Sequence, residues 1–202
     1  MKHEVVIVRT GTANLASVVA AFERAGCPVT ITEEPAATVD AHLLVLPGVG
    51  AFGPVARRLA ERGLAEPLAE RMRQGRPTFA VCLGLQLLAA SSEESPGVAG
   101  LGVLPATITR FAPGLRVPQL GWNRVAAGNS AALLRTGDAY FANSYKLDAI
   151  PEGWTGALAD HGGPFVAAIE RGPVLGCQFH PELSGDWGQA LIERWLAAAE
   201  VA

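Results

Sequence analysis

One stretch decides the fold: Pro77-Thr78-Phe79-Ala80-Val81-Cys82-Leu83-Gly84-Leu85-Gln86. Its first half is apolar and typical of a buried strand, and Pro77 suits the first residue of such a strand. The run from Leu85 to Ala90 predicts a helix. We therefore expect Cys82 at a sharp turn where a buried strand becomes a helix.

A cysteine at such a turn has two interpretations. The turn can expose its side chain above a sheet and near a helix N-terminus, where N–H groups and the helix dipole favour a thiolate. This arrangement resembles the strand–turn–helix elbow of hydrolase nucleophiles, with sulfur in place of the hydroxyl. The alternative is a small buried cysteine that ends a core strand.

The composition indicates a globular protein and argues against several other classes. The chain has 202 residues, of which 50% are hydrophobic and 17% charged, so we expect one globular domain over residues 1–202. A net charge of −3 gives no electrostatic reason to expect nucleic acid binding. The three cysteines form no CxxC or zinc pattern, which predicts a reducing cytoplasmic location and no metal site. The apolar run 5–8 is too short for a signal peptide, and no stretch reaches the roughly 20 residues of a membrane helix.

Strand and helix patterns alternate along the first half. We expect strands at 5–8, 29–31, 42–46 and 77–81, helices at 15–25 and 52–74 with breaks near Gly63 and Pro67, and a loop at 91–100. The second half holds short strand candidates at 103–111, 122–126, 140–145, 156–159, 164–170 and 173–179, and a final helix at 186–199. This order predicts an α/β fold, a flavodoxin-like open, mostly parallel sheet flanked by helices, with an antiparallel extension in the C-terminal half.

A glycine-containing loop, Pro47-Gly48-Val49-Gly50, follows the strand 42–46. Ligand sites in open α/β sheets lie beyond the carboxyl ends of strands, and glycine lets backbone N–H groups approach a ligand closely. The loop lacks a complete G-x-G-x-x-G dinucleotide pattern. It is either part of a ligand site or a plain strand-to-helix turn.

A cysteine nucleophile needs a base, and the base needs a carboxylate that orients it. His3 and His42 lie at strand starts, and His161 lies in a turn, so we expect surface or structural roles for them. His180 instead follows the carboxyl end of an apolar strand, as Cys82 does. Glu182 lies two residues further on, where it can orient the imidazole, although a capping or surface role also fits this pair.

Taken together, these motifs resemble a known family. Val81 to Gln86 is similar to the nucleophile motif of the class I, Cys-His-Glu glutamine amidotransferases, and Gln178-Phe179-His180-Pro181-Glu182 is similar to their His-Pro-Glu motif. Pro47 to Gly50 resembles their oxyanion loop. The resemblance implies that Cys82 attacks the amide of L-glutamine, that His180 passes a proton to departing ammonia, and that water hydrolyses the thioester.

The same resemblance implies further site residues and no cofactor. Backbone N–H groups of Val49, Gly50 and Leu83 are expected to stabilise the oxyanion. The residues expected to bind glutamine are Gly48, Gln86, Glu94, Ser144 and Tyr145.

Other stretches resemble the branch of this family that forms glutaminase subunits of imidazole glycerol phosphate synthases, enzymes of histidine biosynthesis. They include Asn14-Leu15, Gly121-Trp122-Asn123 and Tyr140-Phe141. This implies a heterodimer in which ammonia passes to a (β/α)8-barrel synthase subunit, with Asn14 and Trp122 at the interface.

Some positions depart from that branch. They are Arg9, Thr10, Ala16, Asn143 and Leu183; none is in the expected triad, and four of them bear on docking or coupling. Three alternatives remain: a glutaminase for another synthase, a non-catalytic glutaminase-like module that binds or regulates a partner, and a thiol hydrolase of related fold.

Overall fold

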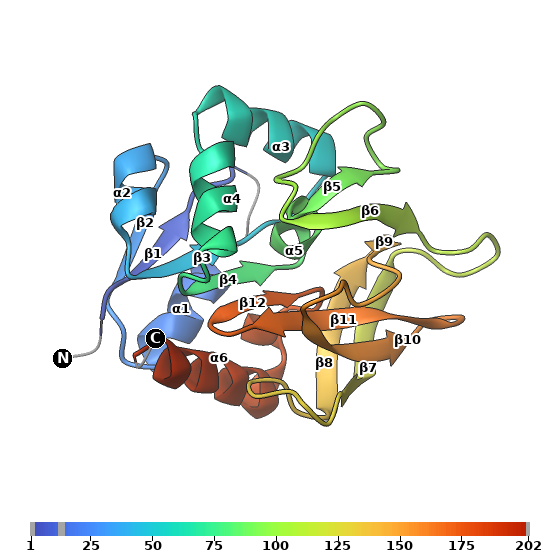
Figure 1. Cartoon of the computed structure of the whole chain (residues 1–202). Helices are drawn as coiled ribbons and strands as arrows, with labels where there is room; N and C mark the ends of the chain where they lie inside the picture. Colours follow the sequence, from blue (N-terminus) through green and yellow to red (C-terminus); the bar gives the residue numbers. More distant parts are fainter. Residues whose placement is uncertain (1–2, 12–14, 201–202) are drawn as a thin grey trace.

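The structure is a computed structural model that describes residues 3–11 and 15–200. Within these residues, nine strands form one sheet in the order β2-β1-β3-β4-β12-β11-β10-β7-β8 (Figure 1). The first five are mutually parallel: β2 (Val29–Thr32), β1 (Val5–Val8), β3 (Leu43–Leu46), β4 (Thr78–Val81) and β12 (Val174–Cys177). The other four continue antiparallel: β11 (Pro164–Arg171), β10 (Thr155–Asp160), β7 (Gln119–Ala127) and β8 (Gly137–Asn143). The predicted α/β sheet with its antiparallel extension is confirmed.

Helices cover both faces of the parallel half (Figure 1). One face carries α1 (Leu15–Arg24) and α6 (Gly185–Ala199), and the other carries α2 (Pro35–Asp40), α3 (Phe52–Glu61) and α4 (Ala65–Arg73). The strands β1, β3 and β4 are buried on both faces, so none shows an alternating pattern: β1 and β3 are apolar throughout, and β4 is apolar after Thr78. No helix in the described part of the chain is long and apolar enough to cross a membrane.

The predicted helix at 85–90 is wrong in its second half. Helix α5 spans Leu83–Leu87, and the chain then enters β5 (Ala89–Ser92), which pairs with β6 (Leu104–Arg110) in a small sheet completed by β9 (Tyr145–Lys146). The Leu88 carbonyl accepts hydrogen bonds from the N–H groups of residues 103 and 104, both at 2.9 Å. Pairing with a distant strand thus outweighs local helix propensity, and the expected loop 91–100 begins only after β5.

The structure differs from the predicted elements in three smaller ways: at Pro67, at α2 and at Ser144. The helix 52–74 is interrupted at Gly63, whose φ of +67° ends α3, but Pro67 lies in the first turn of α4, where its missing N–H has no helical partner to lose. Helix α2 was not predicted, and the strand expected at 140–145 is split at Ser144 into β8 and β9.

The carboxyl ends of β3, β4 and β12 lie side by side. In register, Leu46 pairs with Ala80, and Val81 pairs with Cys177. The segments that follow these strands are the loop 47–50, Cys82 and the turn at His180. The parallel sheet therefore brings the three predicted motifs to one edge.

Candidate active site

Cys82 occupies a strained turn between β4 and α5. Its φ of +52° makes it the one non-glycine residue with a positive φ in the described ranges 3–11 and 15–200, and its ψ is −109°. Such a conformation costs about 1–3 kcal/mol and persists only where the surroundings impose it. Here the Cys82 N–H donates to the Cys177 carbonyl at 2.7 Å, and a Cβ on Gly84 would lie 2.0 Å from the Leu46 carbonyl oxygen. This tight, imposed turn has the geometry of a nucleophile elbow.

The loop 47–50 packs directly against that elbow. A Cβ on Gly48 would lie 2.8 Å from the Leu83 Cβ, so the approach requires glycine. The Leu83 N–H, an expected oxyanion donor, donates to the Gly48 carbonyl at 3.3 Å. In this structure, one expected donor is therefore engaged by the loop itself.

His180 and Glu182 form a buried pair beside Cys82. His180 Nδ1 and Glu182 Oε1 are 2.8 Å apart, and the two side chains are 7% and 6% exposed. The antiparallel half of the sheet fixes this turn, because the His180 N–H donates to the Tyr140 carbonyl of β8 at 2.9 Å. The Ser184 hydroxyl also donates to the His180 carbonyl at 2.6 Å.

The surroundings of His180 set its protonation. Burial disfavours the charged imidazolium, but hydrogen bonds and charge interactions with Cys82 and Glu182 outweigh burial and raise the pKa of His180 to about 10. The imidazole therefore holds two protons at neutral pH. A histidine in this state is a proton donor placed between a sulfur and a carboxylate.

A cavity of about 220 Å³ opens in front of Cys82. Its lining contains Val49, Gly50, Cys82, Leu83, Gln86, Glu94, Ala142, Asn143, Ser144, Tyr145 and His180. The structure thus gathers every predicted oxyanion and glutamine-binding residue at this cavity except Gly48. That glycine lines a neighbouring hollow of about 190 Å³ together with Glu182.

A sequence model of the family described as glutamine amidotransferase class-I matches residues 6–199 of this chain. The chain belongs to the class-I glutamine amidotransferase family. It is 41% identical over 192 residues to the imidazole glycerol phosphate synthase subunit HisH of Thermus thermophilus, covering 95% of each chain. It is also 37% identical over 201 residues to the chloroplastic imidazole glycerol phosphate synthase hisHF of Arabidopsis thaliana, covering 95% of this chain and 34% of that one. A crystal structure of a glutamine amidotransferase has the same fold, with a TM-score of 0.78, 23% identity and 97% and 98% of the two chains covered.

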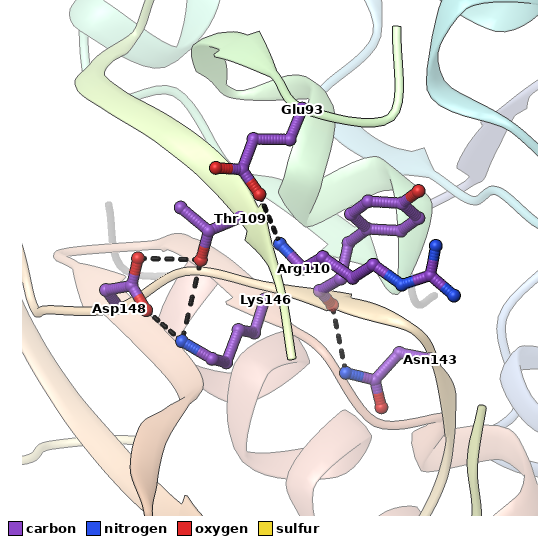
Figure 2. Close-up of polar contacts among 7 residues, drawn as sticks. Glu93, Thr109, Arg110, Asn143, Lys146 and Asp148 are labelled. Carbon is purple, nitrogen blue, oxygen red and sulfur yellow. Dashed lines mark hydrogen bonds and ion pairs between the residues drawn. The ribbon is translucent and has the colours of Figure 1, made fainter. Parts of the chain in front are cut away.

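In this amidotransferase, the far wall of the cavity comes from the β8–β9 junction. The Tyr145 carbonyl accepts hydrogen bonds from Gln86 Nε2 at 3.1 Å and from Asn143 Nδ2 at 3.0 Å. Figure 2 shows Asn143 beside the β6–β9 pairing, where Glu93 accepts from the Arg110 N–H at 2.8 Å and Asp148 accepts from the Thr109 hydroxyl at 2.7 Å. Polar contacts on both sides therefore hold the wall in place.

Glu94 enters the cavity from a different direction. One of its carboxylate oxygens accepts the Phe52 N–H at 2.6 Å, at the start of α3. The carboxylate is thereby anchored at the cavity rim, where its charge can face the ammonium group of a bound amino acid.

Gln178 belongs to the Gln-Phe-His-Pro-Glu motif and lies at the nucleophile, although no role was predicted for it. Its side chain is fully buried, and its Nε2 lies 3.7 Å from the Cys82 sulfur. The sequence pattern that could have identified Gln178 is a polar residue inside the otherwise apolar run 174–179, two residues before His180.

The remaining predicted positions lie elsewhere. Asn14 falls outside the described residues. Trp122 on β7 is 60% exposed, and Leu120 on the same strand and Leu183, directly after Glu182, are also exposed apolar side chains. His3 and His42 lie 4.4 Å apart, ring to ring, at the amino ends of β1 and β3, and His161 contacts the Arg116 carbonyl.

Proposed function

We propose that this chain is the glutaminase subunit of an imidazole glycerol phosphate synthase, producing ammonia for a (β/α)8-barrel synthase subunit in histidine biosynthesis. The observation that carries this proposal is the strained Cys82 elbow with the buried His180–Glu182 pair beside it, at a cavity that both Cys82 and His180 line. The similarity to HisH subunits over nearly the whole chain supports the choice of synthase.

The chemistry follows from this arrangement. The Cys82 sulfur attacks the side-chain carbonyl carbon of glutamine, a C–S bond forms, and the C–N bond breaks as imidazolium His180 gives a proton to departing ammonia. Neutral His180 then takes a proton from water, which hydrolyses the thioester and releases glutamate. Glu182 keeps the imidazole oriented and stabilises its charged form.

The oxyanion of each tetrahedral intermediate needs N–H donors. Val49, Gly50 and Leu83 supply them in this proposal, and one such donor is worth about 10²–10³ in rate. The Leu83 N–H is bound to the Gly48 carbonyl in the chain by itself. This supports low glutaminase activity until docking of the synthase subunit moves the loop.

The docking surface we propose comprises three exposed apolar side chains: Leu120 and Trp122 on β7, and Leu183 directly after Glu182. The Trp122 ring meets the Tyr140 ring edge-on at 6.2 Å, and the Tyr140 carbonyl holds the His180 N–H. A partner that covers Trp122 thus contacts a side chain that packs against Tyr140, the residue whose carbonyl binds the backbone N–H of the catalytic base. Asn14 is proposed as a further interface residue.

Glutamate release is the decisive measurement. We expect little release by the isolated chain and much more with the barrel subunit and its nucleotide ligand. Cys82→Ala should abolish release in both cases, whereas Cys27→Ala, at a buried cysteine outside the cavity, should be kinetically quiet. Full activity without the partner would contradict the coupling, and retained turnover in Cys82→Ala would remove Cys82 from the mechanism.

The proposal also covers the domain organisation of the chain and its location in the cell. Residues 1–202 form one glutaminase domain in this proposal, which the family match over residues 6–199 supports. The odd, widely spaced set of three cysteines supports a cytoplasmic location, where thiols stay reduced.

A further inference from the structure

Two buried amides connect the glutamine pocket to the nucleophile. Gln86 Nε2 donates to the Tyr145 carbonyl at 3.1 Å and to Gln178 Oε1 at 3.0 Å. Gln178 Nε2 in turn lies 3.7 Å from the Cys82 sulfur. The two glutamine residues are 6% and 0% exposed, so water does not compete for these contacts.

The direction of the Gln178 amide is fixed by this arrangement. Both N–H bonds of the Gln86 amide nitrogen are used, one on the Tyr145 carbonyl and one on Gln178 Oε1. Gln178 must therefore present its NH2 group, and not its oxygen, to the Cys82 sulfur. A hydrogen-bond donor aimed at a titratable atom favours the charged form of that atom.

We propose that Gln178 is a further catalytic residue of this glutaminase: its side-chain amide donates to the Cys82 sulfur, stabilises the thiolate and holds it in position for attack. The inference rests on the proposed function, because it takes Cys82 as the nucleophile. Gln178 does not line the cavity, so it acts on the sulfur and not on bound glutamine. Gln86 has a second role here, since it sets the direction of the Gln178 amide.

Other titratable groups surround Cys82 and must stay constant in a test. His180, Glu94 and Tyr145 share the cavity with it, Glu182 lies behind His180, and Cys177 is in the adjacent strand β12. Substitutions at Gln178 leave all of these side chains in place.

The experiment measures alkylation of Cys82 by iodoacetamide against pH in the full chain, with the modified peptide identified by mass spectrometry. Gln178→Met keeps a similar volume but removes both the donor to the sulfur and the acceptor of the Gln86 amide, so the midpoint should rise by about one pH unit and alkylation at pH values below the midpoint should slow about tenfold. Gln178→Glu still accepts from Gln86 but turns a carboxylate oxygen toward the sulfur, so its effect should be larger. Gln189→Met and Gln189→Glu on α6, which does not line the cavity, are matched controls and should match the parent chain.

A steady-state measurement with the barrel subunit keeps the proposal testable if Gln178→Glu does not fold. Gln178→Met should lower kcat about tenfold and leave KM for glutamine unchanged. Equal effects of Met and Glu, parent-like alkylation, or a change confined to KM would overturn the role of Gln178. The proposed function would survive that result as long as Cys82→Ala is inactive, whereas an active Cys82→Ala would refute the proposed function itself.

Discussion

Two buried carboxylates at opposite ends of β12 behave differently. Near its start, Glu170 of β11 pairs with Leu175, and its two oxygens accept N–H bonds from the turn 132–134, including Leu133 at 3.0 Å and Leu134 at 2.9 Å. Beyond its end, Glu182 gives one oxygen to His180, and its other buried oxygen has no hydrogen-bond partner within the described residues.

The contrast distinguishes a carboxylate that stabilises the fold from one that acts on the catalytic base. The Glu170 carboxylate is saturated by backbone N–H groups that do not titrate, so its structural role is to hold the turn between β7 and β8. The Glu182 carboxylate faces a titratable ring and, together with Cys82, raises the pKa of that ring against the effect of burial. Strand β12 thus has a structural carboxylate beside its start, Glu170 on β11, and a carboxylate that acts on the base beyond its end, Glu182.

The largest effect is expected from Glu182→Gln. A neutral amide cannot balance an imidazolium, so glutamate release with the barrel subunit should fall by about 10²–10⁴-fold. Glu170→Gln, corrected for the folded fraction, is the matched control and should keep the parent rate. Comparable losses in both variants would erase the distinction between the two carboxylates.

The pH profile sharpens the same comparison. With a His180 pKa of about 10, release should persist through neutral pH and decline as pH rises through about 10, because the imidazolium then loses the proton that ammonia needs. Removing the carboxylate charge in Glu182→Gln lowers this pKa, so the alkaline decline should move to lower pH. An unmoved decline would show that Glu182 does not control His180.

Glu170→Gln should lose stability instead of rate. Replacing the carboxylate weakens charge-assisted bonds and leaves an N–H of the turn poorly matched, for a cost of about 2–3 kcal/mol in the free energy of unfolding. Urea denaturation checks this value. A cost below about 0.5 kcal/mol, the usual range for surface substitutions, would contradict a structural role.

The smallest effect concerns the elbow. Cys82→Gly and Cys82→Ala both remove the thiol, but only glycine accepts a φ of +52° without strain. Cys82→Gly should therefore be more stable than Cys82→Ala by about 1 kcal/mol, measured as the difference between two urea midpoints at equal slope. Equal stabilities would mean that the turn stores no strain.

The sequence by itself determined the parallel half of the fold and the three motifs. Short, largely apolar runs such as 43–46 and 78–81 are typical of strands covered on both faces, and such strands place Cys82, His180 and the loop 47–50 at one edge. These conclusions need only local periodicity and the rule that ligand sites follow strand ends. The family resemblance then added the glutamine pocket.

Tertiary structure alone decided the rest, because it depends on partners far along the chain. Residues 89–92 form a strand and not a helix because β6 pairs with them, and Glu170 is structural because the turn 132–134 saturates it. The amide of Gln178 points its NH2 group at Cys82 only because Gln86, 92 residues away in sequence, occupies its oxygen. Local sequence patterns reveal the periodicity of helices and strands. The direction of a buried amide instead depends on which atom, distant in sequence, forms a hydrogen bond with its oxygen or its NH2 group.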